Sequence, residues 1–254
     1  MLKDWDELVE RVAREIYEGN QKGIIEPEMV TKHADELMNA IVEGLGYGFD
    51  TDDAQALSTI TKLQANVFHF SGAKNWNQLQ EMSALLTDDS VAKTFNAFLG
   101  AVRNLDATYN ATYLKAEYDH AIASSQMITK WQQIEAEKEA LPFLRYVAVM
   151  DDRTRDEHRR INDTVLPVNH SFWNTHYPPN DWGCRCSVQQ LDQDDAVEYS
   201  QEPPSKLPKV PTLMRNNVGK TGIVFSTKHP YFETIPKKLR KQVATESEKL
   251  ITEK

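Results

Sequence analysis

A group of residues that could bind a metal ion lies between residues 150 and 188. Both cysteines of the chain, Cys184 and Cys186, fall in this stretch and are separated by one arginine. Zinc prefers thiolate, imidazole and carboxylate ligands, usually four of them, drawn from segments that fold together. Two thiolates one residue apart can reach the same ion if Arg185 points away from it. This spacing therefore predicts a zinc site.

His158 is the best third ligand for such a site, whereas the spacing leaves the fourth open. Four residues could supply the fourth donor: Asp151, His170, His176 and Asp181. The alternative is that two reduced cysteines pack as small hydrophobic side chains, and that the nearby histidines are hydrogen-bonded core or surface groups. A disulfide between Cys184 and Cys186 is disfavoured because the short ring that it closes is strained.

Acidic and arginine side chains surround these candidate ligands. Asp151, Arg153, Arg155 and Arg185 could hold a catalytic carboxylate and an anion-binding site. A network of Asp–Arg pairs that braces an irregular, loop-rich module explains them better. Such a module has little regular structure, so a metal ion and packed aromatic side chains would help to stabilise it.

Four separated motifs occur here in a fixed order. They are DDRTRDEH at 151–158, FW at 172–173, YPP at 177–179 and CRC at 184–186. Together they resemble the signature of the phage Mu F-like minor head proteins, a group that includes the SPP1 gp7-type head morphogenesis proteins. The resemblance covers about residues 145–191. The rest of the chain is similar only in style, with a helical N-terminal part and a variable tail.

This resemblance also bears on the metal site. In the family, the positions of Arg155 and His158 often carry a CxxC pair, and a histidine often falls near Asp181. Exchange of Cys for His at one position is expected where both serve as a metal ligand. This sequence departs from that version at Arg155 and Asp181. The resemblance implies a structural zinc ion held by His158, Cys184 and Cys186, with Asp181 as an oxygen ligand.

By the same resemblance, the chain would be a structural protein of the virion and not an enzyme. It implies a minor head protein that acts in capsid and head morphogenesis, binds portal and capsid proteins, assembles in the host cytoplasm and lies inside the phage head, within reach of packaged DNA. The alternative is a zinc-dependent hydrolase or nuclease, in which Asp151 or Glu157 acts as the base beside the His158, Cys184 and Cys186 cluster. Catalytic zinc keeps one position open for water, whereas four protein ligands close a structural site.

Composition fits this interpretation. The chain has 254 residues, 40% of them hydrophobic, which is enough for one large or two modest domains. Two cysteines do not make a disulfide scaffold. No apolar run is long enough to span a bilayer, and the first residues are amphipathic and acidic, so we expect a soluble, unsecreted protein with no membrane partner. A net charge of −9 disfavours broad, nonspecific DNA binding but allows local basic patches.

Hydrophobic periodicity predicts a helical domain over residues 1–141. A glycine-containing break is expected at 44–50, with Thr51 as the cap of the helix that follows. The last helix is either continuous or kinked near Ser124 and Ser125. The expected helices span residues 2–16, 27–44, 51–67, 76–86, 90–102 and 106–139.

The signature module is expected at 142–192, as three short strands and a helix or turn. Pairing of the last strand with residues 146–150 would bring the CRC motif close to Asp151 and His158. A Pro-rich linker at 193–212 and a tail at 213–254, with a short strand and a helix, follow. The NVGKTG run at 217–222 lacks the first glycine of a phosphate loop and is interpreted as a turn. The fold class is therefore α+β: a mainly α-helical N-terminal part with a small, loop-rich α/β module carrying the His/CxC cluster. The expected module elements are strands at 143–150, 165–168 and 186–191 and a helix or turn at 154–162, and those of the tail are a strand at 223–225 and a helix at 237–254.

Overall fold

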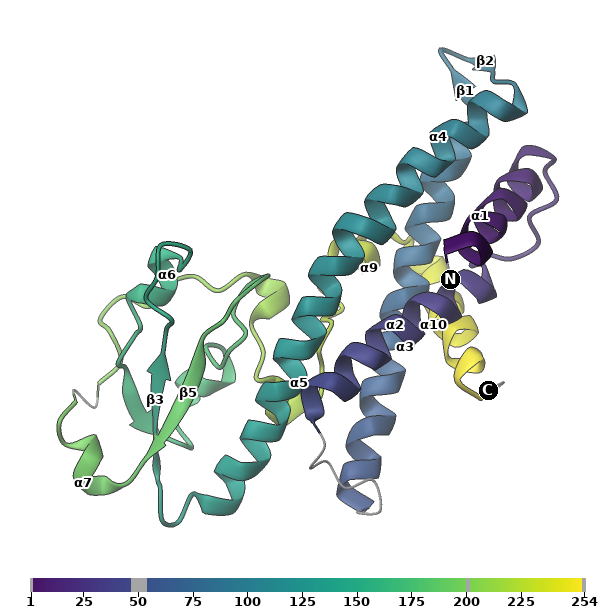
Figure 1. Cartoon of the computed structure of the whole chain (residues 1–254). Coiled ribbons are helices and arrows are strands. Elements are labelled where there is room, and N and C mark those ends of the chain that lie inside the picture. The colour runs from purple at the N-terminus through teal and green to yellow at the C-terminus, as the bar shows by residue number, and fades with distance from the viewer. Residues whose placement is uncertain (1, 47–53, 200–201, 253–254) are drawn as a thin grey trace. The chain divides into compact units, whose positions relative to one another are not determined.

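The computed structural model describes residues 2–46, 54–199 and 202–252 (Figure 1). Helices dominate and the sheets are small and antiparallel, which confirms the α+β class. The chain forms two compact units, each made of discontinuous segments. The first unit comprises residues 1–38, 64–117 and 227–254, and the second comprises 39–63 and 118–226.

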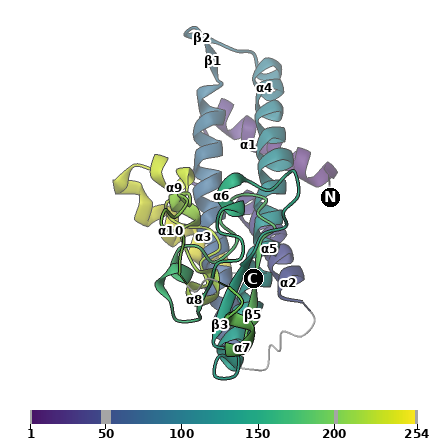
Figure 2. The same ribbon diagram turned by 90° about the vertical axis from the view of Figure 1, so that its left-hand side faces the viewer.

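The first unit is a helical assembly built on the amphipathic pattern at the start of the chain. Apolar residues of α1 pack against α3 and α4, where Leu79 and Phe98 are fully buried. Figure 2 shows α3 and α4 running side by side, joined by the hairpin β1–β2. The elements are α1 (Leu2–Tyr17), α2 (Pro27–Leu45, to residue 38), α3 (Ala54–Ala84, from residue 64), β1 (Thr87–Asp88), β2 (Val91–Ala92), α4 (Phe95–Ala107), the π-helix η1 (Thr108–Tyr113), the start of α5 (Leu114–Glu137), α9 (Pro230–Thr234) and α10 (Lys237–Thr252).

The prediction of two separate helices at 51–67 and 76–86 was wrong, because α3 runs without a break from Ala54 to Ala84. Gly72 weakened the sequence pattern in its middle, since glycine is a poor helix former. In the structure, a Cβ at Gly72 would overlap the hydroxyl of Ser247 in α10. Gly72 therefore allows two helices to approach closely and does not end α3. Most of the break expected at 44–50, and the cap at Thr51, lie outside the described residues.

Residues 87–94 also differ from the expectation. A helix was predicted from Ser90, but Asp89 and Ser90 adopt positive φ angles in the turn of the β1–β2 hairpin. Thr94 then accepts a hydrogen bond from the backbone N–H of Ala97 and caps α4, so that helix starts at Phe95. Further along, Ser124 and Ser125 lie inside α5 without a break, and the irregular turn is η1, between α4 and α5.

The second unit contains the signature module. Its sheet has the order β4–β3–β5, all antiparallel (Figure 1), with Leu144 opposite Leu166 and Tyr146 opposite Val188. The three predicted strands are thus present, although β5 pairs with residues 143–147 and not with 146–150. Besides the ends of α2 and α3, the elements are α5 from residue 118, β3 (Phe143–Val147), α6 (Asp156–Arg159), β4 (Val165–Pro167), the 3-10 helix η2 (Ser171–Asn174), β5 (Ser187–Leu191), α7 (Gln193–Ala196), the 3-10 helix η3 (Thr212–Met214) and α8 (Val218–Thr221).

The segment after β5 starts with a short helix, and its residues 202–211 have no helix or strand. Residues 193–196 form α7, and Pro208 and Val210 are buried. The strand expected at 223–225 is absent. Within 217–222, residues 218–221 form α8, where a Cβ at Gly219 would overlap the Trp131 side chain. None of the helices in the described ranges is long and apolar enough to cross a membrane.

A buried polar network lies at the centre of the first unit. Lys74, only 2% exposed, donates to Glu117 Oε2 at 2.6 Å, to His33 Nε2 at 2.8 Å and to the Tyr109 carbonyl at 3.0 Å. Its three protons are therefore all bound. His33 Nδ1 lies 2.9 Å from Ser71 Oγ. Burial and the adjacent Lys74 charge lower the pKa of His33 to about 4, so this histidine is neutral at pH 7.

Replacement of Lys74 by Met should lower the free energy of unfolding by about 3–5 kcal/mol, because it leaves the Glu117 carboxylate buried without its cation. Addition of Glu117→Leu should restore most of that loss. Arg103→Met is the matched control: it breaks an exposed ion pair with Asp6 and should change stability by less than about 1 kcal/mol. Urea unfolding at pH 7 measures all three. Equal effects of Lys74→Met and Arg103→Met would contradict the assigned role of the network.

Candidate metal centre

Three of the four predicted ligands converge. His158, Cys184 and Cys186 are buried, and one ligand atom from each lies within 4.8 Å of the other two. His158 Nδ1 is 3.7 Å from Cys184 Sγ and 3.4 Å from Cys186 Sγ. Zn–S bonds of about 2.3 Å and Zn–N bonds of about 2.0–2.1 Å at a tetrahedral angle place N and S about 3.6 Å apart. Both N–S distances are close to this value.

The chain after β3 positions His158 through local hydrogen bonds. The Asp151 carboxylate accepts from the backbone N–H of Arg153 and from the Thr154 hydroxyl, which closes a turn. The side chain of Arg159 donates to the carbonyls of Thr154 and Asp151 and ties α6 back to this turn. Because α6 has only four residues, these bonds, and not the helix alone, fix the direction of His158.

A second turn positions the two cysteines. The backbone N–H of Cys184 donates to the carbonyl of Asp181 at 3.1 Å, and Gly183 has φ +65° at the third position of this turn. Arg185 points away from the sulfurs, as the zinc interpretation required. Its guanidinium donates two hydrogen bonds to Asp151, at 2.6 and 2.7 Å. The Arg185 guanidinium also lowers the pKa of the Asp151 carboxyl well below its usual range.

The thiols are arranged so that one of them loses its proton readily. Cys186 first, and then His158 and the backbone of Asn180, lower the pKa of Cys184 to about 4 against the opposing effect of burial. The pKa of Cys186 is raised, first by Cys184 and then by burial, because a second thiolate would add a negative charge beside the first. At neutral pH the pair therefore carries one thiolate, the form that binds metals.

The structure places the four candidates for the fourth ligand in other interactions. Asp181 Oδ2 is 3.3 Å from Arg155 Nε, and Asp181 Oδ1 accepts from the backbone N–H of Trp182. The fourth ligand thus stays a prediction. It is notable that Arg155 and Asp181, the two positions that depart from the family pattern, pair with each other. Of the other three candidates, Asp151 binds Arg185, His170 Nδ1 accepts from the Phe172 backbone N–H, and His176 stacks on the Phe172 ring.

Two residues that support the cysteines were missed in the sequence. The hydroxyl of Tyr146, in β3, donates to the Asn180 side chain at 3.0 Å, and Asn180 in turn donates to Cys184 through its backbone. His120 was missed as well: it lies on α5, fully buried, with its ring 4.9 Å from that of Trp182 and no partner for Nδ1 in the structure. Only the alternating pattern of β3 could have indicated that Tyr146 faces inward. No sequence signal marks His120.

A comparison with known families matches the segment that contains this cluster. Residues 72–189, a little under half of the chain, match the family described as Phage Mu protein F like protein. This range contains His158, Cys184 and Cys186 and all four signature motifs. The segment is thus a Mu F-like module, and the resemblance predicted from the motifs is confirmed.

Two curated proteins illustrate the similarity. Over 93 residues, 37% of this chain, the sequence is 40% identical to the putative capsid assembly protein F of Escherichia phage Mu. Over 52 residues, 20% of this chain, it is 48% identical to the Mu-like prophage FluMu F protein of Haemophilus influenzae. The matched segments span only 19% and 13% of those two proteins. No solved structure matches the chain.

Replacement of Gly183 by Ala tests the turn that carries Cys184. An L-residue at φ +65° is strained, so Gly183→Ala should lower the free energy of unfolding by about 1–2 kcal/mol. Gly100→Ala is the control: Gly100 lies inside α4, a Cβ there meets no atom within 4 Å, and the same change should raise stability by up to about 1 kcal/mol. Thermal or urea unfolding of the two variants should therefore show shifts of opposite sign. A neutral Gly183→Ala would contradict this account of the turn.

Proposed function

We propose that this protein is a bacteriophage structural protein that acts in head assembly, as a minor head protein. The observation that carries the proposal is the Mu F-like match over residues 72–189, together with a relative named as a capsid assembly protein. The finer parts of the proposal are association with portal and capsid proteins, assembly in the host cytoplasm and a final position inside the head, next to packaged DNA.

The geometry of the centre favours a structural role over a zinc hydrolase or nuclease. A hydrolase needs a carboxylate that is free to accept a proton from water near the metal. Asp151 is unsuited to this, because Arg185 and Thr154 hold its oxygens. Glu157 is exposed on α6. We therefore infer that the protein is not an enzyme.

The metal proposed for the centre is a structural zinc ion. His158, Cys184 and Cys186 would hold it, since their donor atoms already have the spacing of zinc ligands and soft sulfur donors favour this metal. Asp181 is the proposed fourth ligand. When bound, zinc supplies a link between α6 and the turn before β5. Because the metal binds the folded chain and not the unfolded one, its binding energy adds to the stability of the module.

Zinc content provides the first test. Protein purified without chelator should contain about one zinc per chain by elemental analysis, and Cys184→Ser with Cys186→Ser should contain none and melt at a lower temperature. Removal of zinc by a chelator should lower the melting temperature of the parent but not of the double variant. The variant Asp181→Asn tests the fourth ligand. Loss of zinc from this variant supports Asp181 as that ligand, and full zinc content overturns the assignment. A parent chain without metal would overturn the zinc proposal.

Head assembly provides the test of the function. In a phage that encodes this protein, deletion of the gene should abolish normal heads, as counted by electron microscopy of lysates, and the intact gene supplied in trans should restore them. A gene with residues 150–188 deleted should fail to restore heads, because the signature module is lost. Normal head numbers after the full deletion would overturn the proposed function.

A further inference from the structure

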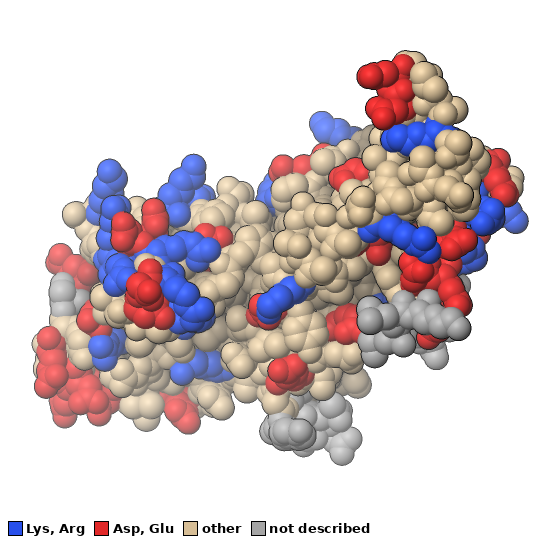
Figure 3. All heavy atoms as spheres, turned by 45° about the horizontal axis from the view of Figure 1, so that its top comes forward, with Lys and Arg blue, Asp and Glu red and all other residues tan. Residues whose placement is uncertain are grey.

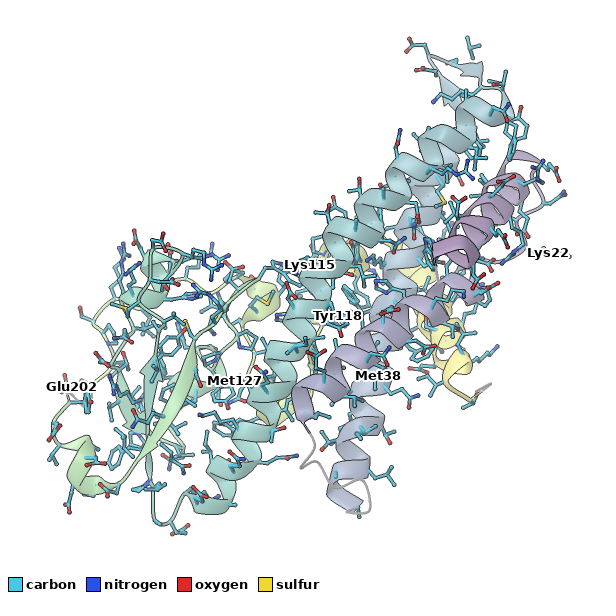
Figure 4. All side chains as sticks on the ribbon, in the orientation of Figure 1. Lys22, Met38, Lys115, Tyr118, Met127 and Glu202 are labelled. Atoms are coloured by element: carbon cyan, nitrogen blue, oxygen red, sulfur yellow. The ribbon has the colours of Figure 1, made fainter. Side chains whose placement is uncertain are left out.

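A groove runs between α5 and the turn that carries the two cysteines, within the second unit. One part has a volume of about 550 Å³ and the next of about 190 Å³. Both parts are lined by Ala123 and Gln126 of α5 and by Cys184 and Arg185 of the turn, so they form one continuous depression. Figure 4 shows Met127, another lining residue, on the side of α5 that faces the module.

The floor of the groove is one face of α5. The lining positions start at Asp119, end at Lys130 and are spaced alternately by three residues and by one, which places them on one side of a helix. The eleven steps from the first to the last rise about 16 Å, the length of about five residues of extended chain. Ile122, Ala123 and Met127 are the apolar positions of this floor, and Asp119, Gln126 and Lys130 are its polar positions. The groove thus has the length and floor that suit an extended peptide.

The walls of the groove are basic. Arg153, Arg155 and Arg185 line one part and Lys130 the other, whereas Asp119 is the one acidic lining residue among the described positions. Arg153 is 74% exposed, and its nearest carboxylate, that of Asp151, is 4.0 Å away. Figure 3 shows Lys and Arg side chains gathered, with acidic ones between them, over the end of the module that holds α6. Arg155 and Arg185 already pair with Asp181 and Asp151, so Arg153 and Lys130 carry most of the positive charge that a ligand in the groove would meet.

We propose that this groove binds an extended acidic segment of another phage head protein. The proposal rests on the proposed function and names a partner class for it. Guanidinium groups bind carboxylates through paired N–H donors, and the contact of Arg185 with Asp151 shows that geometry at the groove wall. Carboxylates of the partner would bind Arg153 and Lys130. Of the four cations, these two take the least part in ion pairs with carboxylates of this chain.

Nucleic acid fits the groove less well. A double helix is too broad to enter a depression of this volume. Single strands bind through bases stacked on free aromatic faces, as well as through basic side chains. Trp182 is the aromatic residue that lines the groove, and its ring packs against His120. The chemistry of the groove therefore favours carboxylates on a peptide.

Fluorescence anisotropy with a labelled peptide of about ten residues, alternating glutamate and alanine, tests the proposal. The full chain should bind it, and Arg153→Glu with Lys130→Glu should weaken binding about tenfold or more. Lys22→Glu with Lys237→Glu makes the same change in net charge at exposed positions of the first unit and should stay within twofold of the parent. Unchanged melting temperatures and zinc contents would show that all variants fold. No peptide binding, or equal loss in both pairs of variants, would overturn the proposal.

A labelled single strand of deoxythymidylate is the competing probe. Tighter binding of this strand than of the peptide, lost with Arg153→Glu and Lys130→Glu, would overturn the peptide assignment in favour of nucleic acid. The same two variants can be supplied in trans to the phage with the deleted gene. If the gene with Arg153→Glu and Lys130→Glu restores normal heads, the groove proposal is overturned and the assembly function stands. If the deleted phage makes normal heads with no gene supplied in trans, the proposed function is overturned, and the anisotropy result still reports on the groove.

Discussion

The second unit depends on the contact between one buried imidazole and two buried thiols. His158 lies 26 and 28 residues from the cysteines that it meets, so this contact joins two turns that share no helix or strand. A buried polar group without a partner costs about 1–3 kcal/mol. Here His158 Nδ1 lies 3.7 Å from Cys184 Sγ and 3.4 Å from Cys186 Sγ, so these three buried polar atoms are partners of one another. The segments between can stay irregular because this contact fixes their ends.

In the first unit, too, a buried polar group needs hydrogen-bond partners, and this need affects the local structure. Lys74 is buried, so each of its three protons must find an acceptor, and one of these is the carbonyl of Tyr109. Tyr109 lies in the π-helix η1, and its carbonyl also accepts from the backbone N–H of Leu114. A π-helical turn is wider than an α-helical turn and is often found where a helix meets a special contact. The irregular turn between α4 and α5 is thus located where the buried lysine requires an acceptor.

The residues of the candidate site could be predicted from the sequence because their types are scarce. Cys184 and Cys186 are the two cysteines of the chain, and His158 lies within the motif that precedes them. Features that depend on distant segments could not be predicted in this way. Gly72 looks like a helix breaker until Ser247 is placed beside it, and Asp181 looks like a free ligand until Arg155 pairs with it. Local patterns identify which residues can act, whereas packing decides which partners they meet.

Arg155 connects the metal centre and the groove. It pairs with Asp181, donates to the carbonyl of Trp182 and also lines the wall of the groove. A change at Arg155 would therefore disturb the proposed fourth ligand and the basic wall together, and its effects could not be assigned to either. Among the described residues, no hydrogen bond or ion pair joins Arg153 or Lys130 to His158, Cys184 or Cys186, although both line pockets that the two cysteines also line. Their charges can therefore be altered while the donor atoms keep their places. The contact of His158 with Cys184 and Cys186 holds the turn that builds one wall, and α5 supplies the other. The groove therefore depends on this contact, whereas the contact does not depend on the charges of Arg153 and Lys130.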